Sequence, residues 1–267
     1  VARAGVSLGK LADLVTGLLL GWWPLWLWVE CCKKLSWKPY AYLMAWAPRP
    51  WSLGPLGTIS KAMRDLITER FSALPDTQGA SGGDFALNPN FPRPRDSLTP
   101  SAVLVPLVDR PDGMTVLLTQ RAAHLSDHPG QVAFPGGRTE DSDDSPVATA
   151  LRETQEEIGL GAEFIQVVGR LADYETATGF RIAPVVGVVR TGFTLSPSAD
   201  EVAEVFEVPL AFVLDSANHV RESAVLRGRE AHYYVLPFES WRIWGVTAGL
   251  LVDLAKLLNA PTSASGK

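Results

Sequence analysis

Residues 136 to 160, GGRTEDSDDSPVATALRETQEEIGL, decide how this chain folds. A pair of glycines opens the stretch and an acidic segment follows. Ser145 and Pro146 are typical of the N-cap and first position of a helix, and Gly159 of its end. Helical spacing places four residues on one mostly apolar stripe, Val147, Leu151, Thr154 and Ile158. The pattern predicts a helix that packs this stripe against a core.

Three glutamates of the same helix, Glu153, Glu156 and Glu157, lie away from the apolar stripe. Like charges three and four residues apart each cost a few tenths of a kcal/mol in an isolated helix. A divalent cation bound by oxygen ligands would offset that cost. A solvated acidic face is the alternative interpretation for three glutamates alone.

The spacing of these residues closely resembles the Nudix box. The matching residues are Gly137, Arg152-Glu153, Glu156-Glu157 and Gly159-Leu160. The resemblance implies an α/β fold, the Nudix-type α/β/α sandwich with a mixed β-sheet. It also implies that Glu153 and Glu157 are the principal ligands of Mg²⁺ or Mn²⁺, with Glu156 as a third. Arg152 would orient a glutamate, and Gly136 and Gly137 would let the backbone pass close to the metal.

The loop before the helix is one residue longer than the commonest Nudix spacing, since fourteen residues separate Gly137 from Arg152. The upstream acid of the box must therefore be Asp143 or Asp144. Either acid is expected to cap the loop or support the metal ligands rather than bind the metal. The longer loop is typical of one branch of the family, the coenzyme A pyrophosphatases.

A second motif, LLTQRAAHLSDHPGQVAFPGG at residues 117 to 137, is similar to the signature of the same branch. The resemblance assigns Arg121, Gly130 and Phe134, together with the glycine pair, to substrate binding. A planar guanidinium such as that of Arg121 matches phosphate oxygens well. Ser126 stands where the branch usually has arginine. A third likeness, WRIWGVTAGLL, spans residues 241 to 251.

The general base is harder to place from the sequence. Glu201 and Glu204 could both approach the site from another loop, and Glu204 is the one included in the predicted catalytic set. An exposed acid beside a strand is an equally good interpretation. His124 and His128 lie in a polar loop and are expected to be solvated rather than to bind metal.

The resemblance implies hydrolysis of coenzyme A, or its acyl or oxidised forms, to 3′,5′-ADP and 4′-phosphopantetheine. One alternative is a Nudix pyrophosphatase for ADP-ribose, NADH or a damaged nucleoside triphosphate. A second is a Nudix domain without activity that senses a ligand, although such domains usually lose a ligand carboxylate. The small-molecule substrate is the expected partner, and a homodimer stays open.

The composition of the chain excludes some other classes of protein. The 267 residues carry 24 basic and 29 acidic side chains and a net charge of −5, which gives no basic footprint for nucleic acid. The two cysteines, Cys31 and Cys32, are adjacent and outside the predicted catalytic region. They exclude a disulfide framework, and fit a reducing, cytoplasmic location.

Residues 1 to 62 differ from the rest, because seven of the nine tryptophans fall there. Three interpretations stay open for this hydrophobic N-terminal extension: membrane contact through residues 11 to 30, a hydrophobic hairpin packed on the enzyme, and a gene start placed too early, with Met63 as the first residue. The uncharged run of sixteen residues after Asp13 is slightly short for a membrane span.

The remaining chain is expected to contain a short helix and a linker over 63–101, the Nudix domain over 102–260 and a disordered tail over 261–267. Two apolar runs, AVLVPLV and MTVLLTQ, are separated by DRPDG and predict a hairpin. Strands are also expected at 164–169, 182–189 and 232–236, with helices after Pro209 and over 247–258.

Overall fold

The computed structural model describes residues 56–74, 82–93, 97–226 and 228–261, all within one compact unit. The Trp-rich extension up to residue 55, with its predicted membrane contact, and the tail after residue 261 lie outside the described residues. Among the described residues, no helix is both long and apolar enough to cross a membrane.

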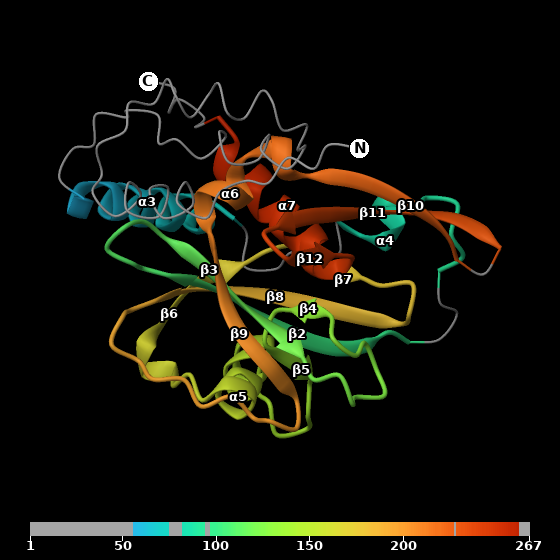
Figure 1. Ribbon diagram of the computed structural model, residues 1–267, viewed down its shortest axis with the longest axis horizontal. Helices are drawn as coiled ribbons and strands as arrows, with labels where there is room; N and C mark the ends of the chain where they lie inside the picture. Colours follow the sequence, from blue (N-terminus) through green and yellow to red (C-terminus); the bar gives the residue numbers. More distant parts are fainter. Residues whose placement is uncertain (1–55, 75–81, 94–96, 227, 262–267) are drawn as a thin grey trace, which may run out of the picture. The chain divides into compact units, whose positions relative to one another are not determined.

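The structure is an α/β/α sandwich with a mixed sheet, as predicted (Figure 1). Its helices are α3 (Leu56–Ser72), α4 (Asp84–Leu87), α5 (Pro146–Ile158), α6 (Leu210–Leu214) and α7 (Val246–Asn259). The strands of the large sheet are β1 (Gly82–Gly83), β2 (Thr99–Val108), β3 (Thr115–Arg121), β4 (Val132–Ala133), β5 (Gly136–Arg138), β6 (Ile165–Arg170), β7 (Tyr174–Glu175), β8 (Phe180–Val189) and β9 (Val202–Pro209). A smaller sheet contains β10 (Val220–Leu226), β11 (Arg229–Phe238) and β12 (Trp241–Trp244).

Strand β2 is the centre of the large sheet. It pairs in parallel with β8 over its whole length, and antiparallel with β3 and β5 on its other side. The β2–β3 hairpin confirms the turn predicted from DRPDG. β9 then pairs antiparallel with β3, and β6 with β8. The short strand β5 thus brings the glycine pair beside the middle of the sheet.

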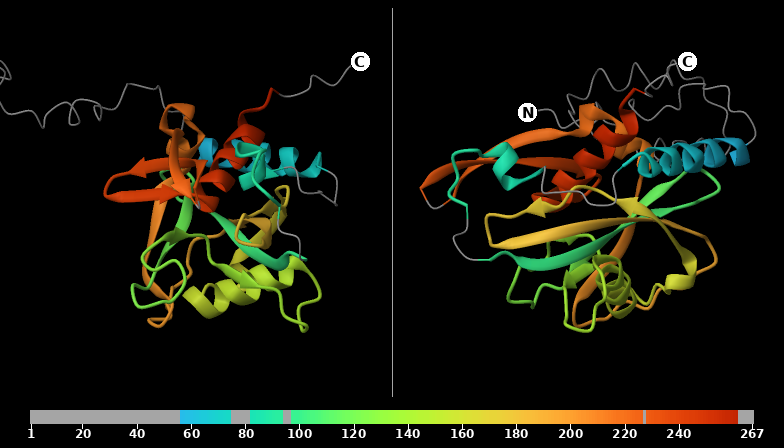
Figure 2. Two further views of the ribbon diagram at one scale, coloured as in Figure 1. Left: turned by 90° about the vertical axis from the view of Figure 1, so that its right-hand side faces the viewer. Right: turned by 180° about the vertical axis from the view of Figure 1, so that it is seen from behind.

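The two faces of the sheet carry different helices. Figure 1 places α5 on one face and α3, α6 and α7 on the other, and the two rotated views of Figure 2 agree. Side chains alternate across β2: Ala102 and Leu104 pack towards α5, whereas Val105 and Leu107 join the large core under α7. Because the sheet is covered on both faces, its central strands read as nearly continuous apolar runs.

Several elements differ from the sequence-based expectations. The first helix begins at Leu56 rather than near residue 63. The end of the second motif, QVAFPGG, contributes two short strands, β4 and β5, and the predicted linker contains β1 and α4. The smaller sheet was expected to supply one strand, at 232–236, but it has three antiparallel strands. Its inner face, including Leu236 and Ile243, packs into the core beneath α7.

Candidate active site

Helix α5 carries the predicted catalytic glutamates. Its N-cap, its C-terminal glycine and its buried stripe are those expected from the sequence. The Ser145 hydroxyl accepts a hydrogen bond from the Ala148 amide at 3.2 Å, and Pro146 occupies the first turn. Gly159 ends the helix in the left-handed conformation, with φ of 71°. Thr154 and Ile158 of the predicted stripe are fully buried, and the Thr154 hydroxyl donates to the Ala150 carbonyl. The helix is therefore held at both ends and along one side.

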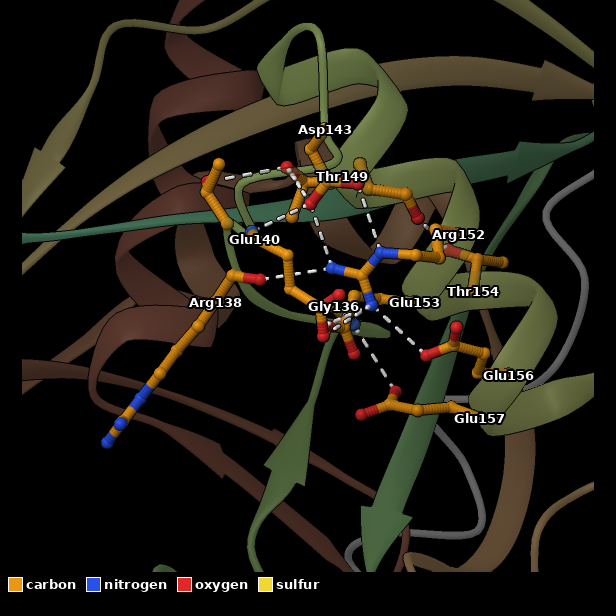
Figure 3. A network of polar contacts seen from close by, with 12 residues as sticks. Gly136, Arg138, Glu140, Asp143, Thr149, Arg152, Glu153, Thr154, Glu156 and Glu157 are labelled. Carbon is orange, nitrogen blue, oxygen red and sulfur yellow. Dashed lines mark hydrogen bonds and ion pairs between the residues drawn. The ribbon is translucent and has the colours of Figure 1, made fainter.

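Arg152 is the centre of a polar clamp between this helix and the preceding loop (Figure 3). Its Nε and Nη2 donate to the two carboxylate oxygens of Asp143 at 3.0 and 2.9 Å, and Nη2 also donates to the Arg138 carbonyl at 3.1 Å. Asp143 in turn accepts from the Glu140 amide and the Thr149 hydroxyl, at 2.9 and 3.0 Å. The Arg152 guanidinium holds the pKa of Asp143 well below its usual range. Asp143 is thus the acid that closes the long loop.

The same guanidinium also contacts two of the three glutamates. Arg152 Nη1 lies 3.0 Å from Glu153 Oε1 and 3.1 Å from Glu156 Oε2. The Glu153 side chain is 16% exposed and that of Glu156 is 58% exposed. Burial raises the pKa of Glu153, and Arg152 opposes the rise. Glu153 therefore faces the protein, whereas Glu156 lies on the outer side of the helix.

Glu157 is the most buried acid of the helix, at 5% exposed. Its Oε2 accepts a hydrogen bond from the Gly136 amide at 3.3 Å. Burial raises its pKa to about 8; the Gly136 amide and Arg121 oppose this rise, while the charges of Glu201 and Glu153 add to it. A carboxylate kept in such surroundings is costly unless a cation lies close by.

The glycine pair leaves room for these carboxylates. A Cβ at Gly137 would lie 2.5 Å from the Cδ of Glu153, so a larger residue there would displace the Glu153 carboxylate. Gly136 has φ of 153°, and a Cβ there would overlap the Ala102 carbonyl oxygen. Gly137 thus lets β5 lie against the Glu153 carboxylate, and Gly136 lets β5 lie close against β2.

The residues predicted for substrate binding occupy different environments. Arg121 ends β3, its Nε lies 3.4 Å from the Asp127 carbonyl, and its charge acts on Glu157. Gly130 has φ of 68° in the loop before β4. Phe134 is 4% exposed and packs into the core on the α7 side. The charge of Arg121 thus acts on Glu157, whereas Phe134 lies in the core.

The two candidates for the general base also lie in different places. Glu201 is exposed in the turn directly before β9, and its charge raises the pKa of both Glu153 and Glu157. Glu204 is exposed on β9 with its Cα opposite that of Gln120. Strand alternation gives it the same side as Phe206, which packs towards α7. The structure thus associates Glu201, and not Glu204, with the helix glutamates.

No group of three His, Cys, Asp or Glu side chains within the described ranges is arranged as a ready metal site. His124 and His128 are exposed in the loop between β3 and β4, as is Ser126. The sequence did not single out Arg138, whose carbonyl anchors Arg152. The one sequence feature that could have indicated a role for Arg138 is its position directly after the glycine pair.

Comparison with known proteins identifies the family. Residues 98–225 match the model of the NUDIX domain. A protein of Escherichia coli O7:K1 named uncharacterized Nudix hydrolase NudL is 40% identical over 169 residues, which cover 63% of this chain and 88% of that one. The protein of the same name from Salmonella paratyphi B is 42% identical over 155 residues, covering 58% and 80% of the two chains.

Two solved structures are more distant. A Nudix hydrolase from M. smegmatis, RenU, has a TM-score of 0.37 and 25% identity, over 43% of this chain and 73% of that one. The NUDIX domain of Shewanella oneidensis NrtR, complexed with ADP ribose, has a TM-score of 0.36 and 22% identity, over 48% and 84%. Likenesses this distant add nothing on substrate. The family model and the NudL relatives agree with the geometry of α5, and the chain belongs to the Nudix hydrolases, enzymes that act on pyrophosphate bonds.

Proposed function

We propose that this protein hydrolyses the pyrophosphate of coenzyme A or its derivatives, releasing 3′,5′-ADP and 4′-phosphopantetheine or its acyl form, with Mg²⁺ or Mn²⁺. The observation that carries the proposal is the pair Glu153 and Glu157, two largely buried carboxylates set against the glycine pair. Such a pair is costly in the free protein and suits a site that binds a cation.

The residues fit a hard divalent cation. All the available donors are carboxylate oxygens, which Mg²⁺ and Mn²⁺ prefer. Glu153 and Glu157 would hold the ion and Glu156 would add a third oxygen ligand after leaving Arg152. A bound ion supplies charge neutralisation at the phosphates and lowers the pKa of a bound water. No three acids converge within the described residues, so the side chains must turn towards the ion when it binds.

The other side chains have separate roles in the proposed site. Arg152 fixes Glu153 while bound to Asp143, so that the carboxylate keeps one orientation. Arg121 supplies a positive charge near Glu157 for a substrate phosphate. Glu201 is our candidate for the acid that accepts a proton from water, because its charge reaches both buried glutamates. The catalytic role of Glu204 stays a prediction.

The upstream motif supports coenzyme A as the substrate, and the long loop closed by Asp143 agrees with it. Ser126, exposed in that motif, provides no charge where arginine is usual, so ADP-ribose, NADH and damaged nucleoside triphosphates are the alternative substrates. The intact glutamate set speaks against a ligand sensor without activity. Cytoplasmic location, membrane contact and a homodimer stay predictions.

A substrate panel tests the proposal. The full chain is incubated with Mg²⁺ or Mn²⁺ and, in turn, coenzyme A, ADP-ribose, NADH and 8-oxo-dGTP, and products are resolved by chromatography. Preferential release of 4′-phosphopantetheine is expected. Preferential turnover of ADP-ribose would refute the assignment of substrate, and binding without any turnover would favour the sensor. Glu157→Gln should abolish turnover, whereas Glu163→Gln, an exposed acid after α5, should retain it.

A further inference from the structure

Arg138 follows the glycine pair and points its side chain away from the glutamates. Its carbonyl is fixed by Arg152, while its guanidinium runs out of the network in Figure 3. The side chain is exposed, and its guanidinium carbon lies 5.4 Å from the centroid of the Phe180 ring. Within the described part of the chain this guanidinium has no ion pair. The Arg138 guanidinium thus lies over the Phe180 ring and is not paired with a carboxylate of the described residues.

The sheet topology shows where this side chain must run. Arg138 is on β5 and Phe180 is on β8, and these strands flank opposite sides of β2. The Cα of Arg138 pairs with that of Ser101 and the Cα of Phe180 with that of Thr99, so the Arg138 side chain reaches Phe180 over the face of β2 that carries Thr99 and Ser101. Ser101 is 8% exposed, and its hydroxyl has no hydrogen-bond partner. A buried hydroxyl without a partner is unfavourable, and a ligand oxygen beside Arg138 would satisfy it once the side chains that cover the hydroxyl move aside.

We propose that Arg138, supported by Phe180 and Ser101, binds a phosphomonoester on the nucleoside half of the substrate. The inference rests on the proposed function, under which this group is the 3′-phosphate of coenzyme A. The Cα atoms of consecutive residues are about 3.8 Å apart, and the Glu153 carboxylate lies against Gly137. Neighbouring strand residues face opposite sides of the sheet, so a substrate with its diphosphate at the glutamates would reach Arg138 past the outer edge of β5, which pairs with β2 alone among the described strands.

The chemistry favours phosphate over other ligands. Phe180 supports one face of the guanidinium and leaves its N–H edges open, and these edges match phosphate oxygens in pairs. The Ser101 hydroxyl provides one more donor at the same place. A nucleotide base could instead stack on the face of the guanidinium that Phe180 leaves open. Binding of that kind would not depend on a phosphomonoester.

Binding of two product-like nucleotides tests the inference without turnover. Calorimetry with Mn²⁺ compares 3′,5′-ADP with 5′-AMP, which lacks only the 3′-phosphate. The full chain should bind 3′,5′-ADP at least about tenfold more tightly, and Arg138→Ala should reduce the preference to less than about twofold. Arg190→Ala is the matched control, because Arg190 also lies over a phenylalanine ring, that of Phe164, and should keep the preference.

Several results would overturn the inference. They are equal binding of the two nucleotides by the unmodified chain, an unchanged preference in Arg138→Ala, and no binding of either nucleotide. Equal weakening of both nucleotides would indicate base stacking instead. Ser101→Ala should lower the preference about threefold without lowering Tm; a lower Tm would show that the hydroxyl already has a partner and would remove it from the subsite.

Turnover separates this inference from the proposed function. If the chain hydrolyses coenzyme A, the ratio of kcat/KM for coenzyme A to that for dephospho-coenzyme A should fall about tenfold or more in Arg138→Ala. Hydrolysis with an unchanged ratio would overturn the subsite and leave the proposed function standing. If neither compound is hydrolysed, the proposed function fails, and nucleotide binding alone decides the subsite.

Discussion

Replacing Glu157 by glutamine should make the metal-free protein more resistant to alkaline pH. Burial raises the pKa of Glu157 to about 8, compared with a value near 4.5 in the unfolded chain. Between these two values the folded protein holds a proton that the unfolded chain has released. Its stability therefore falls as pH rises, by about 1.4 kcal/mol for each pH unit up to pH 8. Glutamine carries no charge at any of these pH values and removes this dependence.

The expected difference is large enough to measure. From pH 6 to pH 9 the unmodified protein should lose about 2–3 kcal/mol of unfolding free energy more than Glu157→Gln. Urea unfolding followed by tryptophan fluorescence, with EDTA present, measures both proteins at each pH. Millimolar Mn²⁺ in place of EDTA should remove the deficit of the unmodified protein and have less effect on the variant. A difference between the two proteins that does not change with pH would refute the reasoning.

Three further predictions concern the residues around the glutamates. Asp143→Asn removes one charge of the clamp and should reduce metal affinity or kcat about 10- to 100-fold, whereas the exposed Asp144→Asn should have little effect; equal effects of the two would contradict the clamp. Gly137→Ala places a methyl group where a glutamate carboxylate lies, and calorimetry should show weaker Mn²⁺ binding while circular dichroism shows a folded protein; unchanged Mn²⁺ binding would be inconsistent with the close approach. Glu201→Gln should reduce kcat about 100-fold or more and Glu204→Gln by less than about threefold; the reverse order would restore Glu204 as the base.

The sequence predicted the helix that bears the site because every signal in it is local. The cap at Ser145, the turn at Gly159 and the buried stripe all lie within fifteen residues, and each is found in the structure. The hairpin of β2 and β3 and the final helix were predicted from equally local patterns.

The parts that the sequence did not predict depend on contacts between distant residues. β12 packs beneath α7, and the indole ring of its Trp241 stacks on the ring of Phe206 in β9, with the ring centroids 4.1 Å apart. No local sequence pattern predicts either contact. Glu201 and Glu204 looked equivalent because the sequence does not reveal the register shift in the β3–β9 pairing, near Arg121, which separates the surroundings of the two acids. The path of Arg138 across β2 likewise requires the strand order. The sequence therefore predicted the helix that carries the glutamates, but not the strands and side chains from distant parts of the chain that lie around it.

Product formation from coenzyme A tests the central claim most directly. The full chain and Glu157→Gln are incubated with coenzyme A in Mn²⁺ and in EDTA, and products are identified by mass spectrometry. The unmodified chain with Mn²⁺ should release equal amounts of 3′,5′-ADP and 4′-phosphopantetheine, and both other conditions should release neither. Equal product from Glu157→Gln, or product formed in EDTA, would contradict a metal site built on the α5 glutamates.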